Sequence, residues 1–155
     1  MTETHMHNSI LAAWNALDAP SAAETILPCN GSRAWADQLA ALRPFQTAFD
    51  LTCTADIVWR ALPASDWQQA FDSHQRIGET PTSTAEAVLA AASAAYEEKF
   101  GRIFIVHTTG RSTEEILAIL QHRLSNDPPT ELREAVEQQR QITQLRLRKW
   151  LAAST

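Results

Sequence analysis

His74 is the residue of this chain best placed to do chemistry. It belongs to the segment Phe71-Asp72-Ser73-His74-Gln75-Arg76-Ile77-Gly78, and on a helix it shares one face with Trp67 and Phe71. The dipole at the C-terminal end of a helix favours the protonated imidazole, whereas burial opposes it, and this balance sets a proton donor near neutral pH. The alternative is a core histidine whose ring is satisfied by a backbone carbonyl.

Arg146 is the second candidate for a functional side chain. It lies one turn after Ile142, on the inner face of the last expected helix. A buried arginine needs an acidic partner or an anionic ligand. The alternative is a stem that lies along the core while the guanidinium reaches water.

The other residues that could do chemistry show no ligand or nucleophile pattern. Cys29 and Cys53 are isolated thiols without CxxC or Cys/His spacing, so we expect two buried, reduced cysteines and no metal site. His107 and His122 are far apart in sequence, and we expect them to be surface or structural residues.

Helix signals recur along the chain, whereas signals for β-structure are scarce. Capping boxes begin at Ser65, Ser83 and Ser112, each followed by apolar residues three and four apart. The sequence also predicts a short helix carrying Leu11, Trp14 and Leu17, one capped by Ser32 and ended by Pro44, one over residues 45–62, and one over 130–151 after the break at Asn126-Asp127-Pro128-Pro129. The expected fold class is all-α, a single-domain multi-helix bundle.

Length and composition indicate an ordinary globular domain. We expect one domain over residues 1–155, with 1–8 frayed, because 155 residues with 45% hydrophobic content can bury one core. A formal net charge of −5 argues against nucleic acid or an anionic membrane surface as the main partner. No long apolar run and no basic-then-apolar start occurs, so we expect a soluble, cytoplasmic protein with a small-molecule substrate.

Four stretches of the chain follow one sequence pattern in the same order. They are Ser32-Arg33-Ala34-Trp35 through Leu42-Arg43-Pro44-Phe45; Trp67 to Gly78; Tyr96-Glu97-Glu98-Lys99-Phe100-Gly101-Arg102-Ile103-Phe104-Ile105 with Gly110-Arg111-Ser112; and Arg123-Leu124-Ser125-Asn126 with Glu131 and Ile142 to Leu147. Together they resemble the decarboxylase family that acts on 2-oxo-4-hydroxy-4-carboxy-5-ureidoimidazoline (OHCU) in urate catabolism. The resemblance covers nearly the whole chain.

The resemblance implies an all-α fold of the OHCU decarboxylase type and a cofactor-free enzyme, a homodimer, that converts OHCU to (S)-allantoin. Loss of CO₂ leaves negative charge on carbon, which must be delocalised and then protonated on one face, and histidine is a natural acid for that step. The family's catalytic histidine falls on His74, with Gln75 beside it counted among the substrate-binding residues. The match also assigns substrate contacts to Arg146 and to the backbone amides of Ile105 and Val106.

Two features depart from the family pattern. Gln75 replaces the proline that follows the histidine, which removes a φ restraint and adds a backbone donor. A helical stretch with Ser-x-x-Glu-Gln, whose last two residues hydrogen-bond the substrate, is shortened here. Its counterpart is Ser83-Thr84-Ala85-Glu86, with Ala87 at the glutamine position, so Glu86 is the candidate acid and Glu79 a weaker substitute. The same four residues also form an ordinary capping box.

Three functions therefore stay open. The first is an active OHCU decarboxylase, or a variant acting on a related ureido or imidazoline acid. The second is a degenerate relative that binds a small ring ligand without turnover. The third is a helical interaction module, in which the alanine-rich helix from Thr84 to Tyr96 supplies a dimer face.

Overall fold

The structure is a computed structural model that describes residues 8–76 and 81–153. Over these ranges the chain forms eight α-helices and one short 3₁₀ helix, with no strand, which confirms the all-α prediction. The described residues group into two compact units, 8–70 with 140–153, and 71–139. The single domain over 1–155 stays a prediction. Residues 1–7 of the segment predicted to fray lie outside the described ranges, whereas Asn8 is described and caps the first helix.

The first unit is built around three fully buried tryptophans. Its elements are α2 (Ser9–Asn15), α3 (Ala19–Ile26), η1 (Leu27–Cys29), α4 (Arg33–Ala41), α5 (Ala48–Ala61), most of α6 (Ala64–Asp72) and the C-terminal part of α9 (Pro128–Ala152). Trp14, Trp35 and Trp59 are each at most 1% exposed. The indole N–H of Trp14 donates to the Ala22 carbonyl at 2.8 Å, and that of Trp35 to the Ala55 carbonyl at 3.2 Å, so burial leaves neither donor unpaired.

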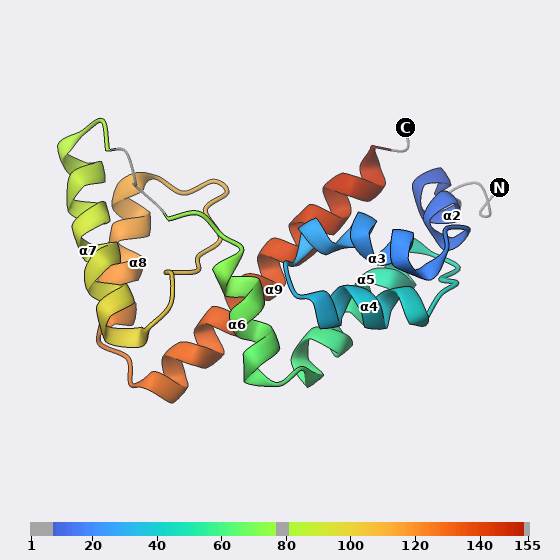
Figure 1. The fold of residues 1–155 in the computed structure, drawn as a ribbon. Coiled ribbons are helices and arrows are strands. Elements are labelled where there is room, and N and C mark those ends of the chain that lie inside the picture. Colours follow the sequence, from blue (N-terminus) through green and yellow to red (C-terminus); the bar gives the residue numbers. More distant parts are fainter. Residues whose placement is uncertain (1–7, 77–80, 154–155) are drawn as a thin grey trace. The chain divides into compact units, whose positions relative to one another are not determined.

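The second unit contains the end of α6, α7 (Thr84–Phe100), α8 (Thr113–Leu124) and the first part of α9. Figure 1 shows α7 and α8 side by side, in agreement with their contacts. The core between them is formed by Leu89, Tyr96, Phe104, Val106, Ile116 and Leu120. Gly101 ends α7 in the left-handed conformation, with φ 72°, and the segment after it has no regular structure although three of its residues are buried.

The helix boundaries correct several predictions. Helices α3 and η1 were not predicted, although Pro20 in the first turn of α3 is a helix-start signal. Helix α6 begins at Ala64, so Ser65 lies inside it and is not its cap. Helix α9 begins at Pro128, two residues before the predicted start, because a proline is tolerated in the first turn, where its missing N–H has no intrahelical partner.

The prediction that both cysteines are buried is wrong for Cys53, which is exposed, whereas Cys29 is buried, and both cysteines are free. Leu17 was predicted to belong to the first helix, but α2 ends at Asn15 and Leu17 is 38% exposed. None of the described helices is both long and apolar enough to cross a membrane.

Candidate active site

His74 lies two residues beyond the end of α6, not inside the helix as its spacing predicted. The chain still turns there, since the His74 backbone N–H donates to the Phe71 carbonyl at 3.2 Å. Phe71 is fully buried and His74 is half-buried, so the expected partial desolvation of the imidazole is present. His74 Nε2 lies 2.6 Å from Oε1 of Gln139. Because an amide oxygen can only accept, Nε2–H is the donor of this hydrogen bond.

Two consecutive glutamines of α9 form hydrogen bonds to two different segments of the second unit. Gln139 is fully buried and contacts the His74 ring, whereas Gln138 Oε1 accepts the His107 backbone N–H at 2.8 Å. Gln138 also donates to Glu134 at 3.2 Å. The sequence patterns did not predict these roles. The available signal was two polar residues on the inner stripe of an amphipathic helix.

The backbone at Ile105 and Val106 offers unpaired donors in a buried place. The two residues are 1% and 5% exposed. The Ile105 carbonyl accepts from Nη1 of Arg123 at 2.6 Å, and because a trans peptide is planar, the Val106 N–H of the same unit points the opposite way. Among the described residues, no acceptor bonds the N–H of Ile105 or of Val106. Buried backbone donors are rarely left unpaired, so these two are suited to an acceptor on a ligand.

A buried ion pair fixes that segment. Arg123 is 2% exposed and Glu131 fully buried, and Nε of Arg123 lies 2.9 Å from Oε2 of Glu131. Tyr96 also donates its hydroxyl to Glu131, and Asn126 donates to it at 3.1 Å. Burial, with a smaller effect of the hydrogen bond to Glu131, raises the pKa of Tyr96 to about 12, so its hydroxyl stays a donor at neutral pH.

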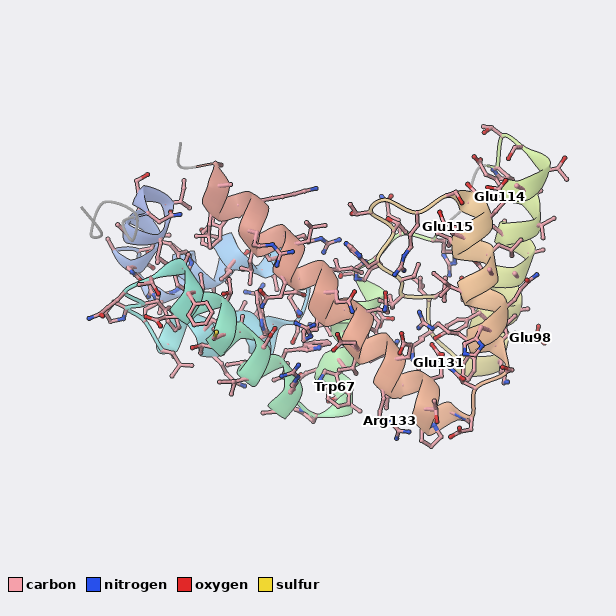
Figure 2. All side chains as sticks on the ribbon, turned by 180° about the vertical axis from the view of Figure 1, so that it is seen from behind. Trp67, Glu98, Glu114, Glu115, Glu131 and Arg133 are labelled. Atoms are coloured by element: carbon pink, nitrogen blue, oxygen red, sulfur yellow. The ribbon has the colours of Figure 1, made fainter. Side chains whose placement is uncertain are left out.

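The two ends of this ion pair come from α8 and α9. Figure 2 shows Glu131 on the first turns of α9, near α8, with Arg133 on another side of the same helix. Arg123 and Glu131 belong to a stretch that resembles the family, but the sequence patterns assigned them no role. Together they fix the orientation of the peptide group between Ile105 and Val106.

The carboxylate of Glu86 accepts hydrogen bonds at the start of α7. Its Oε1 accepts the backbone N–H of Thr82 at 2.9 Å and the Thr82 hydroxyl at 3.0 Å, while Ser83 Oγ accepts the Glu86 N–H at 3.1 Å. These contacts match the capping interpretation of this motif, except that the carboxylate bonds Thr82 and not the N–H of Ser83. Gln75 is exposed, and Glu79 lies outside the described residues.

Arg146 belongs to the first unit, whereas the other predicted site residues that are described belong to the second: His74, Gln75, Glu86, Ile105 and Val106. Arg146 is half-buried and its Nη1 donates to the Pro28 carbonyl at 3.3 Å. Within the described ranges no carboxylate forms an ion pair with it. Burial raises the pKa of the neighbouring Cys29 thiol to about 11, which the positive charge of Arg146 opposes.

His107 and His122 are the two other histidines that the structure describes. His107 is half-buried and bonded through its backbone, and His122 is exposed on α8, in line with their expected structural and surface positions. No group of three histidine, cysteine, aspartate or glutamate side chains that could hold a metal ion occurs among the described residues.

Comparison with known proteins identifies the class to which this fold and site belong. The family model for OHCU decarboxylase matches residues 15–148. The chain is 32% identical over 144 residues to the uric acid degradation bifunctional protein of Arabidopsis thaliana, covering 78% of this chain and 44% of that protein. The chain therefore belongs to the OHCU decarboxylase family, and it spans less than half the length of this curated relative.

Solved structures agree with this assignment. A crystal structure of OHCU decarboxylase in the presence of (S)-allantoin matches with a TM-score of 0.78 and 33% identity, covering 83% of this chain and 98% of that one. An (S)-allantoin synthase structure matches with a TM-score of 0.75 at 17% identity, covering 91% of this chain and 54% of that one, which supports the fold alone.

Proposed function

We propose that this chain decarboxylates OHCU to (S)-allantoin in the degradation of urate, without a cofactor. The observation that carries the proposal is the match to an OHCU decarboxylase along 98% of its length, at 33% identity. The arrangement of His74 and of the Ile105–Val106 backbone supports it, since the reaction needs one proton donor and donors for a developing negative charge.

His74 is the proposed general acid. When the bond from the ring carbon to the carboxylate breaks, CO₂ leaves and the electron pair remains on the ring, delocalised into the neighbouring imine or carbonyl. The pair forms a double bond to the neighbouring, ureido-bearing ring carbon while the imine nitrogen takes up the negative charge. His74 then gives a proton to one face of that ureido-bearing carbon and is reprotonated from solvent. The hydroxyl on the carbon that lost CO₂ gives up its proton, which the ring nitrogen takes, and becomes the carbonyl of allantoin. The hydrogen bond from Nε2 to Gln139 keeps the ring in one orientation, so that only one face is protonated.

The unpaired N–H groups of Ile105 and Val106 are the proposed donors to the substrate oxygen that gains negative charge. Fixed donors in a water-poor place stabilise such charge without reorganising. Arg146 and Gln75 complete the proposed set of substrate contacts, and Glu86 remains a candidate acid. The role of Arg146 is supported by its half-buried guanidinium, which has further N–H donors besides the one that binds the Pro28 carbonyl.

We also propose a homodimer in the cytoplasm. Helix α5 carries Phe49, Cys53 and Ile57 four residues apart, and Phe49 and Ile57 are 73% and 67% exposed. Two large apolar side chains on one exposed helix face are typical of a surface that another copy of the chain covers. The two free thiols support the compartment.

Ligand binding without turnover is the second candidate function. It is favoured by one observation, that the carboxylate of Glu86 is already bonded to Thr82 at the start of α7. Binding of allantoin by a protein that releases no CO₂ from OHCU would establish this second function.

The test of the proposed function is CO₂ release from freshly made OHCU by the wild-type chain and by His74→Asn. Removing a general acid costs about 10²- to 10⁴-fold in rate, so the variant should fall to near the uncatalysed rate. His122→Asn, which changes an exposed histidine, is the matched control and should keep full turnover. Turnover by His74→Asn within a few-fold of wild type would refute the role of His74.

A further inference from the structure

Arg102 carries a charge that the protein itself does not neutralise. Its Nε and Nη1 atoms are buried and have no hydrogen-bond partner among the described residues. In the same part of the chain, no carboxylate forms an ion pair with it. Removing two charged N–H donors from water without giving them an acceptor is unfavourable, and an acceptor with a negative charge would offset that cost. An anionic ligand supplies that acceptor.

The surroundings of Arg102 place this charge at the candidate site. Its Cζ lies 5.9 Å from the centroid of the Phe71 ring, and the carbonyl of Phe71 accepts the backbone N–H of His74. Arg102 also precedes Ile105 by three residues, in the irregular segment that carries the two unpaired amides. One short stretch therefore brings together a partly buried guanidinium and the two backbone N–H donors of Ile105 and Val106.

The buried carboxylate of this core does not pair with Arg102. It belongs to Glu131, which hydrogen-bonds to Arg123, Tyr96 and Asn126. The guanidinium does lie close enough to the Tyr96 hydroxyl to oppose the rise in the pKa of that group, but a neutral phenol does not balance a charge.

We propose that Arg102 is the residue of this site that binds a carboxylate on the ligand. Nε–H and Nη1–H lie on opposite edges of the planar guanidinium, so one of them donates a charge-assisted hydrogen bond to a carboxylate oxygen. The proposal rests on the proposed function only for the choice of ligand, a five-membered ureido ring with one carboxylate. In OHCU this is the group that leaves as CO₂.

This role predicts an effect on substrate binding more than on the chemical step. The carboxylate is charged in the bound substrate and loses its charge as CO₂ forms, so contacts with Arg102 weaken as the reaction proceeds. Arg102→Met should therefore raise KM more than it lowers kcat. Substitution of His74 should instead lower kcat more than it raises KM.

The proposal is tested by calorimetric binding of hydantoin-5-acetate and of its uncharged methyl ester, which differ in the carboxylate charge and one methyl group. Wild type should bind the acid about tenfold or more tightly than the ester, from the usual strength of hydrogen bonds between charged groups. Arg102→Met should lose this preference and bind the ester as wild type does. Arg133→Met, which changes an exposed arginine of α9, is the matched control and should keep the preference.

Thermal unfolding separates this role from a structural one. Arg102→Met removes an unpaired buried charge and keeps an apolar side chain beside Phe71, so its Tm should equal or exceed that of wild type. An unchanged preference for the acid in Arg102→Met would overturn the proposal. So would a lower Tm with weaker binding of the ester, or failure of wild type to bind either ligand. None of these measurements uses turnover. The binding role of Arg102 and the decarboxylase activity of the chain can therefore be refuted independently of each other.

Discussion

Gln139 contacts His74, the proposed general acid, through its amide oxygen. It lies 65 residues after His74 in the chain, is fully buried, and accepts the imidazole Nε2–H at 2.6 Å. Gln139→Met keeps the volume of the side chain but leaves that N–H without this acceptor, and an unpaired buried donor costs about 1–3 kcal/mol. We therefore expect kcat to fall about tenfold with little change in KM, measured by steady-state CO₂ release. An unchanged kcat would show that the contact does not orient the ring.

The sequence indicated which residue types the candidate site contains better than it indicated their contacts. It singled out His74 as a candidate because an imidazole near a glycine, in a stretch that resembles the family, is an unusual combination. Gln139 was not recognisable because its partner, His74, lies far along the chain. Arg102 was not recognisable because what distinguishes it is that two of its nitrogens have no hydrogen-bond partner among the described residues. Neither property has a local sequence pattern.

At the scale of elements, the pair Arg123–Glu131 joins α8 to α9 and holds the backbone before Val106. Glu131→Gln leaves the Arg123 charge buried and unpaired, which costs about 3–5 kcal/mol. We expect that loss in the free energy of unfolding, measured by denaturant titration. Arg123→Met with Glu131→Met removes both charges and should recover much of the loss. Equal destabilisation by the single and the double change would contradict this explanation.

Helix α7 provides a separate test at the same scale, through Glu86. The contacts of this carboxylate with Thr82 need only an acceptor oxygen, so Glu86→Gln should keep most of the turnover. Glu86→Ala should lose about 1 kcal/mol of stability, as other helix-capping residues do. If Glu86→Gln folded as wild type does but released no CO₂, the carboxylate itself would take part in the reaction.

Three of the predicted helices begin at the local capping signal that the sequence contains. Ser32, Ser83 and Ser112 each accept a backbone N–H at the start of a helix, as expected. The same signal failed at Ser65, because the helix already starts at Ala64, directly after Pro63. Helix α3 was missed because its buried face consists of Ala22, Ala23 and Ile26, so that large apolar residues do not mark its periodicity.

At the scale of the whole molecule, the exposed apolar residues of α5 predict self-association. Phe49→Asp with Ile57→Asp puts charges on a face that is apolar at these positions and should convert a dimer to a monomer. Light scattering coupled to size-exclusion chromatography measures the change. The matched control is Val88→Asp on α7, an exposed apolar residue of a different helix, which should leave the dimer intact. A monomeric wild-type chain would contradict the predicted dimer.

Membership of the OHCU decarboxylase family rests on the fold and on the sequence match, whereas activity rests on whether this site protonates one face of the ring. Spontaneous decay of OHCU in water protonates both faces and gives racemic allantoin. The most direct measurement is therefore circular dichroism of the allantoin formed from fresh OHCU in the presence of the chain. We predict an excess of (S)-allantoin that disappears in His74→Asn. A racemic product at high protein concentration would contradict catalysis by this site.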